Sequence, residues 1–233
     1  DVALAIGGEP FFLKTPKVIG IKLTGKLKPM VAAKDVILEV LRILGVKGGV
    51  GKALEYFGPG VKTLSVPERA TITNMGAETG ATTSIFPSDE VTLEFMRCVG
   101  REDQWVRLEA DNDVEYDEII EIELDKLVPL IAKPHSPGDV VPVSEVEGTK
   151  VDQVCIGSCT NSSFKDLVTA AYMLKGKRVN PEVSLTVSPG SMSVYCELAE
   201  RGYLADLIAA GARILECTCG PCIGQGQAPK SGA

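Results

Sequence analysis

Three of the seven cysteines are spaced so that they could bind one metal or cluster. Cys159 lies in the loop sequence GSCTNSS, and Cys219 and Cys222 form a Cys-Gly-Pro-Cys pair sixty residues later. A Cys-x-x-Cys pair can bring two thiolates to one cluster, and thiolates are the usual ligands of clustered iron. Electron-transfer [4Fe–4S] clusters are normally held by four cysteines. Ligation by three would leave one iron without a protein ligand, free to act as a Lewis acid on a hydroxyl or a water.

The elements expected in the second half of the chain place these cysteines at one sheet edge. Strand patterns cover residues 151–157, 183–188 and 212–217, and helix patterns begin at Ser162 or Ser163 and near Ser191. This alternation predicts a parallel sheet with helices on both faces. Ligand sites in such sheets lie beyond the carboxyl ends of the strands. Two of the three strand ends carry the cysteines, so we expect the trio at that edge.

The first half of the chain predicts a second α/β unit. Ser65 and Glu68 form a capping box that encloses Pro67, which predicts a helix from there through Glu78. Other patterns predict strands over residues 17–25, 82–86 and 118–124, and helices over residues 35–44 and 88–98. The turn-rich segment 133–139 separates the halves. The predicted fold class is α/β, as two α/β/α three-layer domains with mainly parallel sheets, at residues 1–135 and 136–233.

Composition and charge argue against several classes of protein. The 233 residues are 45% hydrophobic and 24% charged, which is typical of a folded domain. A net charge of −7 repels phosphate, so nucleic acid is not an expected partner. No apolar stretch has the length of a membrane helix, so we expect no membrane partner. The first residues lack signal-peptide features and the cysteines are unevenly spaced, so we expect a reduced, cytoplasmic protein. The single histidine, His135, lies in a Pro-flanked turn and is assigned no role, which argues against a His-based triad.

The cysteine motifs and several longer segments resemble those of the aconitase family of [4Fe–4S] hydro-lyases. The matching segments are GSCTNSS, CGPCIGQ, PKVIGIKLTG, KGGVGKALEYFGPGV, ITNMGAETGATTSIFPSDE and SLTVSPGS. The resemblance implies a fold like the iron–sulfur domains of that family, with a [4Fe–4S] cluster held by Cys159, Cys219 and Cys222. The open iron would bind the hydroxyl and a carboxylate of the substrate. Cys155 and Cys217 fall outside the matching positions, and we expect both to be buried strand residues.

The resemblance also assigns two residues of the first half to the active site. Asn74 and Glu78 lie four positions apart, so a continuous helix would place both on one face. A carboxylate beside an iron-bound hydroxyl or water can hydrogen-bond it and assist its departure or return. Without the resemblance, the pair would be assigned to an ordinary solvated helix face. With it, we expect Asn74 and Glu78 to point into the site.

The reaction implied is reversible dehydration of a hydroxy-tricarboxylate, citrate to isocitrate through cis-aconitate. The alternative within the family is the large subunit of 3-isopropylmalate dehydratase or homoaconitase. SCTNSS and NMGAETGATTS favour the first, and HSPGDVVPVSEVEGTKVDQV favours the second. A function of another class is a non-catalytic iron–sulfur-binding module that senses iron or oxygen, since an incompletely ligated cluster readily loses iron on oxidation.

Several catalytic segments of the family have no counterpart in this sequence. They are an Asp-Ser-His-Thr segment with further His and Asp residues upstream, substrate-binding arginines downstream, and a serine base in a mobile domain or subunit. The chain therefore resembles the second and third domains of a longer enzyme. Its expected partners are the N-terminal domain and the mobile C-terminal domain or subunit, and we expect the isolated chain to be inactive.

Two short motifs have competing interpretations. The sequence KGGVGK at residues 47–52 resembles a phosphate-binding loop, but such a loop follows a strand and needs a hydroxyl where this chain has Ala53. A tight turn is therefore expected there. The CGPC sequence also matches a thioredoxin dithiol, which should open a long helix that lowers the pKa of its first thiol. The IGQGQAP that follows opposes a helix, so redox exchange is disfavoured.

Overall fold

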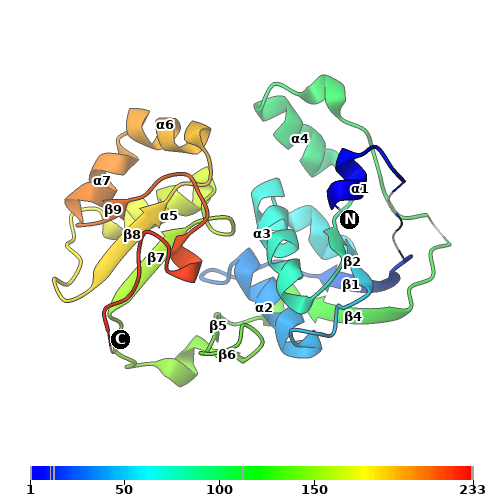
Figure 1. Cartoon of the computed structure of the whole chain (residues 1–233), viewed down its shortest axis with the longest axis horizontal. Coiled ribbons are helices and arrows are strands. Elements are labelled where there is room, and N and C mark those ends of the chain that lie inside the picture. Colours follow the sequence, from blue (N-terminus) through cyan, green and yellow to red (C-terminus); the bar gives the residue numbers. More distant parts are fainter. Residues whose placement is uncertain (1, 11, 13, 112, 232–233) are drawn as a thin grey trace. The chain divides into compact units, whose positions relative to one another are not determined.

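The computed structural model describes residues 2–10, 12, 14–111 and 113–231 of the chain. The chain divides into two compact units, Asp1–Glu145 and Val146–Ala233, and each has its own sheet and hydrophobic core (Figure 1). The main sheet of each unit is parallel. The predicted α/β class with mainly parallel sheets is therefore confirmed.

The first unit is built on a four-stranded sheet with the order β3-β2-β1-β4. Its strands are β1 (Lys17–Thr24), β2 (Lys52–Phe57), β3 (Thr83–Ile85) and β4 (Glu118–Glu123). Alternate residues face the core, and Ile21 of β1 lies in register between Tyr56 of β2 and Ile120 of β4. These three side chains are buried in one cluster with residues of helices α2 (Ala33–Leu44) and α3 (Val66–Gly76). One face of the sheet is therefore covered by α2 and α3.

Shorter helices complete the first unit. They are α1 (Val2–Ile6), α4 (Glu90–Cys98) and the 3₁₀ helices η1 (Pro59–Thr63), η2 (Ala77–Thr79), η3 (Glu102–Gln104) and η4 (Leu124–Lys126), with η5 (Val143–Val146) at the boundary between units. The N-cap of α4 is Asp89, one residue after the start of the helix expected over residues 88–98, because the Asp89 carboxylate accepts from the N–H groups of Val91 and Thr92. The KGGVGK sequence joins helix α2 to strand β2, so it is the expected turn and lacks the strand-to-helix order of a phosphate-binding loop.

The segment expected to be a linker is a hairpin turn within the first unit. Strands β5 (Leu130–Ala132) and β6 (Val140–Pro142) pair antiparallel on either side of residues 133–139. Val140 is buried against Leu38 and Leu41 of α2. Because this hairpin packs on α2, the division between units falls after Glu145 and the expected boundary at 135/136 lies inside the first unit.

The second unit is built on a three-stranded parallel sheet with the order β7-β8-β9. Its elements are β7 (Gln153–Gly157), α5 (Phe164–Leu174), β8 (Ser184–Ser188), α6 (Met192–Glu200), α7 (Tyr203–Ala209), β9 (Arg213–Ile214) and the 3₁₀ helix η6 (Pro221–Ile223). Leu167, Leu198 and Leu207, one from each α-helix, join Leu185 and Val187 of β8 in a single cluster. All three helices therefore contribute to the core on the same face of the sheet.

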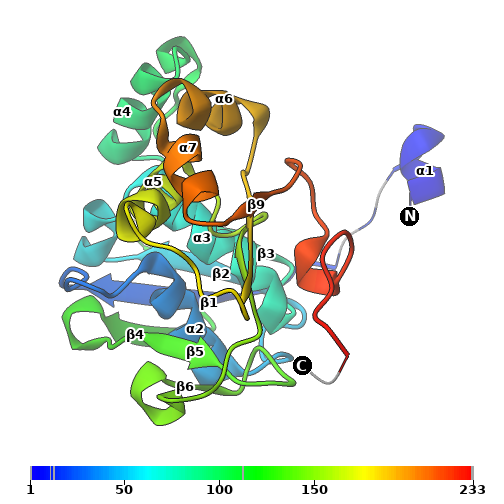
Figure 2. The ribbon, with the colours of Figure 1, turned by 90° about the vertical axis from the view of Figure 1, so that its left-hand side faces the viewer.

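The other face of this sheet differs from the expected helical layer. The register places Cys155, Thr186 and Arg213 in one row on that face. Figure 2 shows α6 and α7 on one side of β9 and the segment after β9 (red) on the other. Cys155 lies on the edge strand β7 and is exposed, so its prediction as a buried strand residue is wrong. Cys217 is half-buried and follows β9, so that prediction is wrong as well.

Candidate cluster site

The loop after β7 places Cys159 at the carboxyl end of that strand. Gly157 has a φ of 114°, and a Cβ there would lie 2.0 Å from the carbonyl oxygen of Ser188 at the end of β8. The N–H of Ser158 donates to the same carbonyl at 3.1 Å. Ser158 has a φ of 66°, which is uncommon for a residue with a Cβ. This tight turn joins the ends of β7 and β8 and leaves Cys159, the next residue, exposed.

Helix α5 begins directly after the Cys159 loop. Ser163 is its N-cap: the Ser163 Oγ accepts from the N–H of Asp166, and the Asp166 carboxylate accepts from the N–H of Ser163, both at 3.2 Å. The sequence left Ser162 and Ser163 as possible caps, and Ser163 is the N-cap in the structure. The positive end of the helix dipole therefore lies beside the loop and favours negative charge there.

Cys219 and Cys222 enclose the start of the short helix η6. The N–H groups of Ile223 and Gln225 both donate to the Gly220 carbonyl, at 3.0 Å each, and Gly224 ends the turn with a left-handed φ of 77°. Both cysteines are exposed free thiols. Because no long helix follows Cys219, this pair lacks the structural context of a thioredoxin dithiol.

Electrostatics links the three thiols to one another. The hydrogen bond and the charge of Cys222 raise the pKa of Cys219, and desolvation and the charge of Cys159 raise it further. The sulfur of Cys159 is therefore within electrostatic reach of Cys219, within one unit and at one sheet edge. A thioredoxin-like dithiol needs a lowered pKa at its first thiol, so the direction of this shift also disagrees with redox exchange.

The donor set of this candidate site is three free thiols. Across the described residues, no group of three or more His, Cys, Asp or Glu side chains is placed to hold one metal ion. All seven cysteines are free, and thiolate is the ligand that iron–sulfur clusters select. Three exposed thiols at one sheet edge are compatible with such a group.

A cavity of about 270 Å³ lies beside this cysteine pair. Cys219 and Gly220 line it from the segment after β9, Ser188 lines it from the end of β8, and Arg213 lines it from the start of β9. The site therefore has an open volume next to one of its sulfurs, within the second unit.

Asn74 and Glu78 belong to the first unit, at the far end of α3. The helix begins at the expected capping box, where the Glu68 carboxylate accepts from the N–H of Ser65 at 2.8 Å. It ends at Gly76 and tightens into η2, so Asn74 and Glu78 do not share one continuous α-helix as expected. Both side chains are exposed.

Close contacts fix the backbone on both sides of Glu78. A Cβ at Gly76 would lie 2.1 Å from the Oγ of Ser84 in β3, so the helix approaches β3 at a residue without a side chain. The buried Thr79 donates its hydroxyl to the Gly76 carbonyl at 2.7 Å, and its own carbonyl accepts from the N–H of Gly49 at 2.9 Å. Glu78 is thus an exposed carboxylate on a turn whose backbone is fixed by the hydrogen bonds of its neighbour Thr79.

A buried ion pair that the sequence patterns did not indicate ties α3 to α4. Two nitrogens of the Arg69 guanidinium donate to the two carboxylate oxygens of Asp89, at 2.8 Å each. The side chains are 5% and 4% exposed. Arg69 also donates to the carbonyls of Leu64 and Val61, at 3.1 and 3.0 Å. Asp89 lies twenty residues from Arg69, so no local spacing could reveal the pair.

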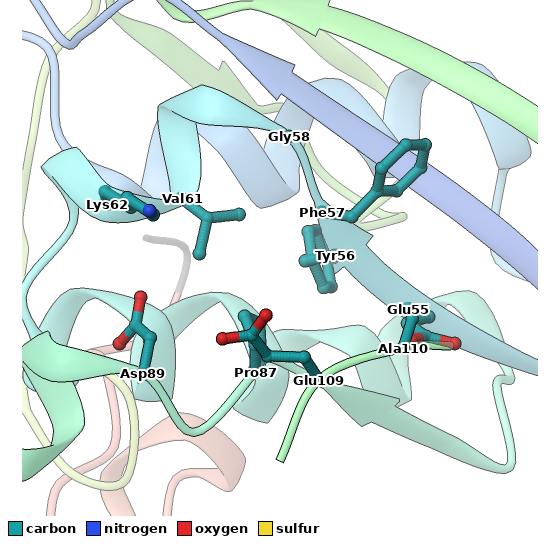
Figure 3. A pocket seen from close by; sticks show the side chains of 10 residues that line it. All are labelled: Glu55, Tyr56, Phe57, Gly58, Val61, Lys62, Pro87, Asp89, Glu109 and Ala110. Atoms are coloured by element: carbon teal, nitrogen blue, oxygen red, sulfur yellow. The ribbon is translucent and has the colours of Figure 1, made fainter. Parts of the chain in front are cut away.

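A separate cavity of about 220 Å³ lies at the carboxyl end of β2. Figure 3 shows Lys62 and Val61 on one side of it, facing Asp89, Pro87 and Glu109. The carboxylate of Asp89 is already bound by Arg69. None of the predicted site residues lines this cavity.

Comparison with known proteins decides the family. A model of the aconitase family (aconitate hydratase) matches residues 1–233. The chain belongs to this family. It is 43% identical over 224 residues to 3-isopropylmalate dehydratase large subunit 2 of Archaeoglobus fulgidus, and 42% identical over 226 residues to 3-isopropylmalate dehydratase large subunit 1 of Thermotoga maritima. Each match covers 96% of this chain and 54% of the relative, so this member of the aconitase family spans about half the length of those relatives.

A solved structure also matches this member of the aconitase family. Aconitase X of Thermococcus kodakaraensis in its holo-form aligns over 88% of this chain and 44% of that one, with a TM-score of 0.49 and 16% identity. Among the described residues, no helix combines the length and the apolar character that crossing a membrane requires.

Proposed function

We propose that this chain is the cluster-binding part of a hydro-lyase that removes water from a hydroxy acid and adds it back. Cys159, Cys219 and Cys222 would hold a [4Fe–4S] cluster and leave one of its irons without a ligand from this chain. When bound, such a cluster supplies a Lewis-acidic iron that polarises a hydroxyl. The observation that carries the proposal is the placement of three exposed free thiols after the ends of two strands of one parallel sheet, in a chain of the aconitase family. The raised pKa of Cys219, to which both other thiols contribute, supports it.

The chain's own residues would hold negative charge and move a proton. The start of α5, directly after the Cys159 loop, has backbone N–H groups and a positive dipole end that favour an anionic group. We assign to the exposed carboxylate of Glu78 the exchange of a proton with the departing or returning hydroxyl. The Asn74 amide would donate a hydrogen bond in the same site. The base that takes the proton from carbon would come from outside this chain.

The substrate supported best is that of 3-isopropylmalate dehydratase, the alternative within the family. It is a malate with an isopropyl substituent. The two relatives reported above are named as 3-isopropylmalate dehydratase large subunits, which supports this substrate over citrate. It is a hydroxy-dicarboxylate, so the same dehydration at a hydroxyl-bearing carbon applies. The word "large" in those names also supports a smaller partner subunit, in keeping with the expected mobile domain or subunit.

The test is anaerobic reconstitution with iron and sulfide, followed by iron and sulfide counts and electron paramagnetic resonance. We expect the unsubstituted chain to take up about four irons and four sulfides, and Cys159→Ser to lose most of this uptake. Cys196→Ser is the matched control, because Cys196 is an exposed free thiol on α6 outside the trio. Equal uptake by Cys159→Ser and the unsubstituted chain would overturn the proposal. A cluster in the complete enzyme without any dehydratase turnover would favour the non-catalytic module instead.

A further inference from the structure

The segment that carries Cys219 and Cys222 returns across the sheet of the second unit. We call residues 218–230 the return segment. Its Gln227 bridges two strands: the Oε1 accepts from the Arg213 guanidinium at 2.9 Å, and the Nε2 donates to the Ser184 hydroxyl at 2.8 Å. Arg213 and Ser184 are the first residues of β9 and β8. The segment therefore leaves the carboxyl edge of the sheet, where the cysteines lie, and is bound again at the amino edge.

The strand register shows which face the return segment covers. Arg213 pairs with Thr186, and the neighbouring pair, Val187 and Ile214, packs in the core with the helices. Arg213 and Ser184 therefore belong to the face opposite the helices, since side chains alternate along a strand. Thr186 on that face is 1% exposed although no α-helix of the core cluster lies there. The return segment takes the place of a helical layer.

Both ends of the cysteine turn are thereby attached to the sheet. Before it, the N–H of Leu215 donates to the Val187 carbonyl at 2.8 Å and continues the pairing of β9 with β8. After it, Gln227 is half-buried, while its neighbours Gly226 and Ala228 are exposed. Fixing both ends of a short loop removes most of its alternative conformations. The loop therefore loses less conformational entropy when Cys219 and Cys222 bind a cluster than a free loop would lose.

We infer that Gln227 is a positioning residue for the cluster ligands Cys219 and Cys222, an inference that rests on the proposed function. Its amide offers one acceptor and one donor, which match the Arg213 guanidinium and the Ser184 hydroxyl. A second anchor, the ion pair of Lys230 with Asp152 at 2.9 Å, is exposed and contributes little. Gln227 acts on the cluster through the turn that it holds, without being a ligand.

The test compares Gln227→Leu, Gln227→Glu and Lys230→Ala with the unsubstituted chain, all reconstituted anaerobically. The rate at which a chelator bleaches the cluster's visible absorbance is measured, together with its paramagnetic resonance spectrum. We expect Gln227→Leu to bleach about fivefold faster and to broaden the spectrum, because both hydrogen bonds are lost. Gln227→Glu should restore the slow rate, since a carboxylate can accept from both Arg213 and Ser184. Lys230→Ala should behave as the unsubstituted chain.

Hydrogen exchange on the cluster-free chains gives a second measurement. In Gln227→Leu, the amides of Ile223 and Gln225 should exchange faster, while the amides of β8 should not change. Unchanged bleaching and exchange in Gln227→Leu, or equal bleaching by the Leu and Glu variants, would overturn this inference alone. Failure of the unsubstituted chain to take up any cluster would overturn the proposed function and the role of Gln227 with it.

Discussion

At the scale of single residues, the site depends on a glycine that no other residue can replace. Gly157 ends β7 with a φ of 114°, and the space where its Cβ would be is taken by the Ser188 carbonyl. Gly211, in the same unit, has a similar φ of 102°, but no atom lies within 4 Å of a Cβ built there. The two positions therefore separate the cost of the backbone conformation from the cost of the contact.

Replacing Gly157 by Ala should destabilise the second unit more than replacing Gly211 by Ala. Gly211→Ala adds strain at an unfavourable φ, about 1–3 kcal/mol. Gly157→Ala adds the same strain and a clash with backbone, which raises the cost by about another 1–3 kcal/mol. The measurement is the free energy of opening of the β8 amides by hydrogen exchange. Equal destabilisation by the two variants would contradict the contact at Ser188.

Residue types and spacing predicted that the three cysteines follow strand ends, but not the surroundings of the other thiols; ligation of a cluster by the trio stays a prediction. Cys159, Cys219 and Cys222 follow strand ends, and the order of elements along the chain fixes where strand ends lie. The burial of Cys155 depends on what covers the outer face of β7, which no local pattern encodes. An apolar strand pattern indicates one buried face, and here the other face of the edge strand is open to solvent.

At the scale of elements, the Arg69–Asp89 pair connects two helices of the first unit. Burial alone would raise the pKa of Asp89. This pKa is nevertheless held below its ordinary value, by the hydrogen bonds and charge of Arg69 and by the N–H groups of Thr92 and Val91. The same carboxylate caps α4. One side chain thus joins the start of α4 to the helix that carries Asn74.

Asp89→Asn should destabilise the first unit by about 3–5 kcal/mol at neutral pH, because it leaves the buried Arg69 charge uncompensated. A carboxylate with a lowered folded-state pKa stabilises above its unfolded value, near 3.8, and loses this contribution as the pH falls through the folded value. The stability gap between Asp89→Asn and the unsubstituted chain should therefore narrow below about pH 3.8. Hydrogen exchange of the β1 amides at several pH values measures it.

The control for this prediction is Glu123→Gln, which removes the exposed pair with Lys126 and should change nothing measurable. A gap between Asp89→Asn and the unsubstituted chain that widens in acid would contradict the assigned direction of the pKa.

Element starts were more predictable than element ends. Ser65 and Ser163 cap their helices through neighbours three residues away, so the signal is local. The end of α3 at Gly76 is set by contact with Ser84 on another strand, and the hairpin of β5 and β6 by packing on α2. Such long-range contacts do not appear in a local pattern, which is why the helix was expected to reach Glu78 and the hairpin turn was expected to be a linker.

At the scale of the whole molecule, the proposed function gives this chain the thiols and a carboxylate of a longer enzyme's site. It spans about half the length of the 3-isopropylmalate dehydratase large subunits that it matches. Its single histidine, His135, is exposed in the β5–β6 turn and belongs to no predicted site. The proposed function therefore assigns the base that takes the proton from carbon to another domain or subunit.

The complete enzyme should dehydrate isopropylmalate at least tenfold more efficiently than citrate, judged by kcat/KM from the absorbance of the alkene formed. The chain alone should load its cluster and turn over neither substrate. Glu78→Gln in the complete enzyme should lower kcat by about 10²–10⁴-fold, as expected for loss of a general acid–base group. A higher kcat/KM for citrate would contradict isopropylmalate as the substrate, and turnover by the chain alone would contradict a base outside this chain.

The most direct test of the central claim is controlled oxidation of the reconstituted cluster, with iron counted per chain. A cluster held by Cys159, Cys219 and Cys222 has one iron that no thiolate of this chain retains. Mild oxidation should therefore release one iron, leave a paramagnetic three-iron cluster, and be reversed by ferrous ion under reducing conditions. Retention of every iron, or collapse of the whole cluster without a three-iron stage, would contradict ligation by three cysteines.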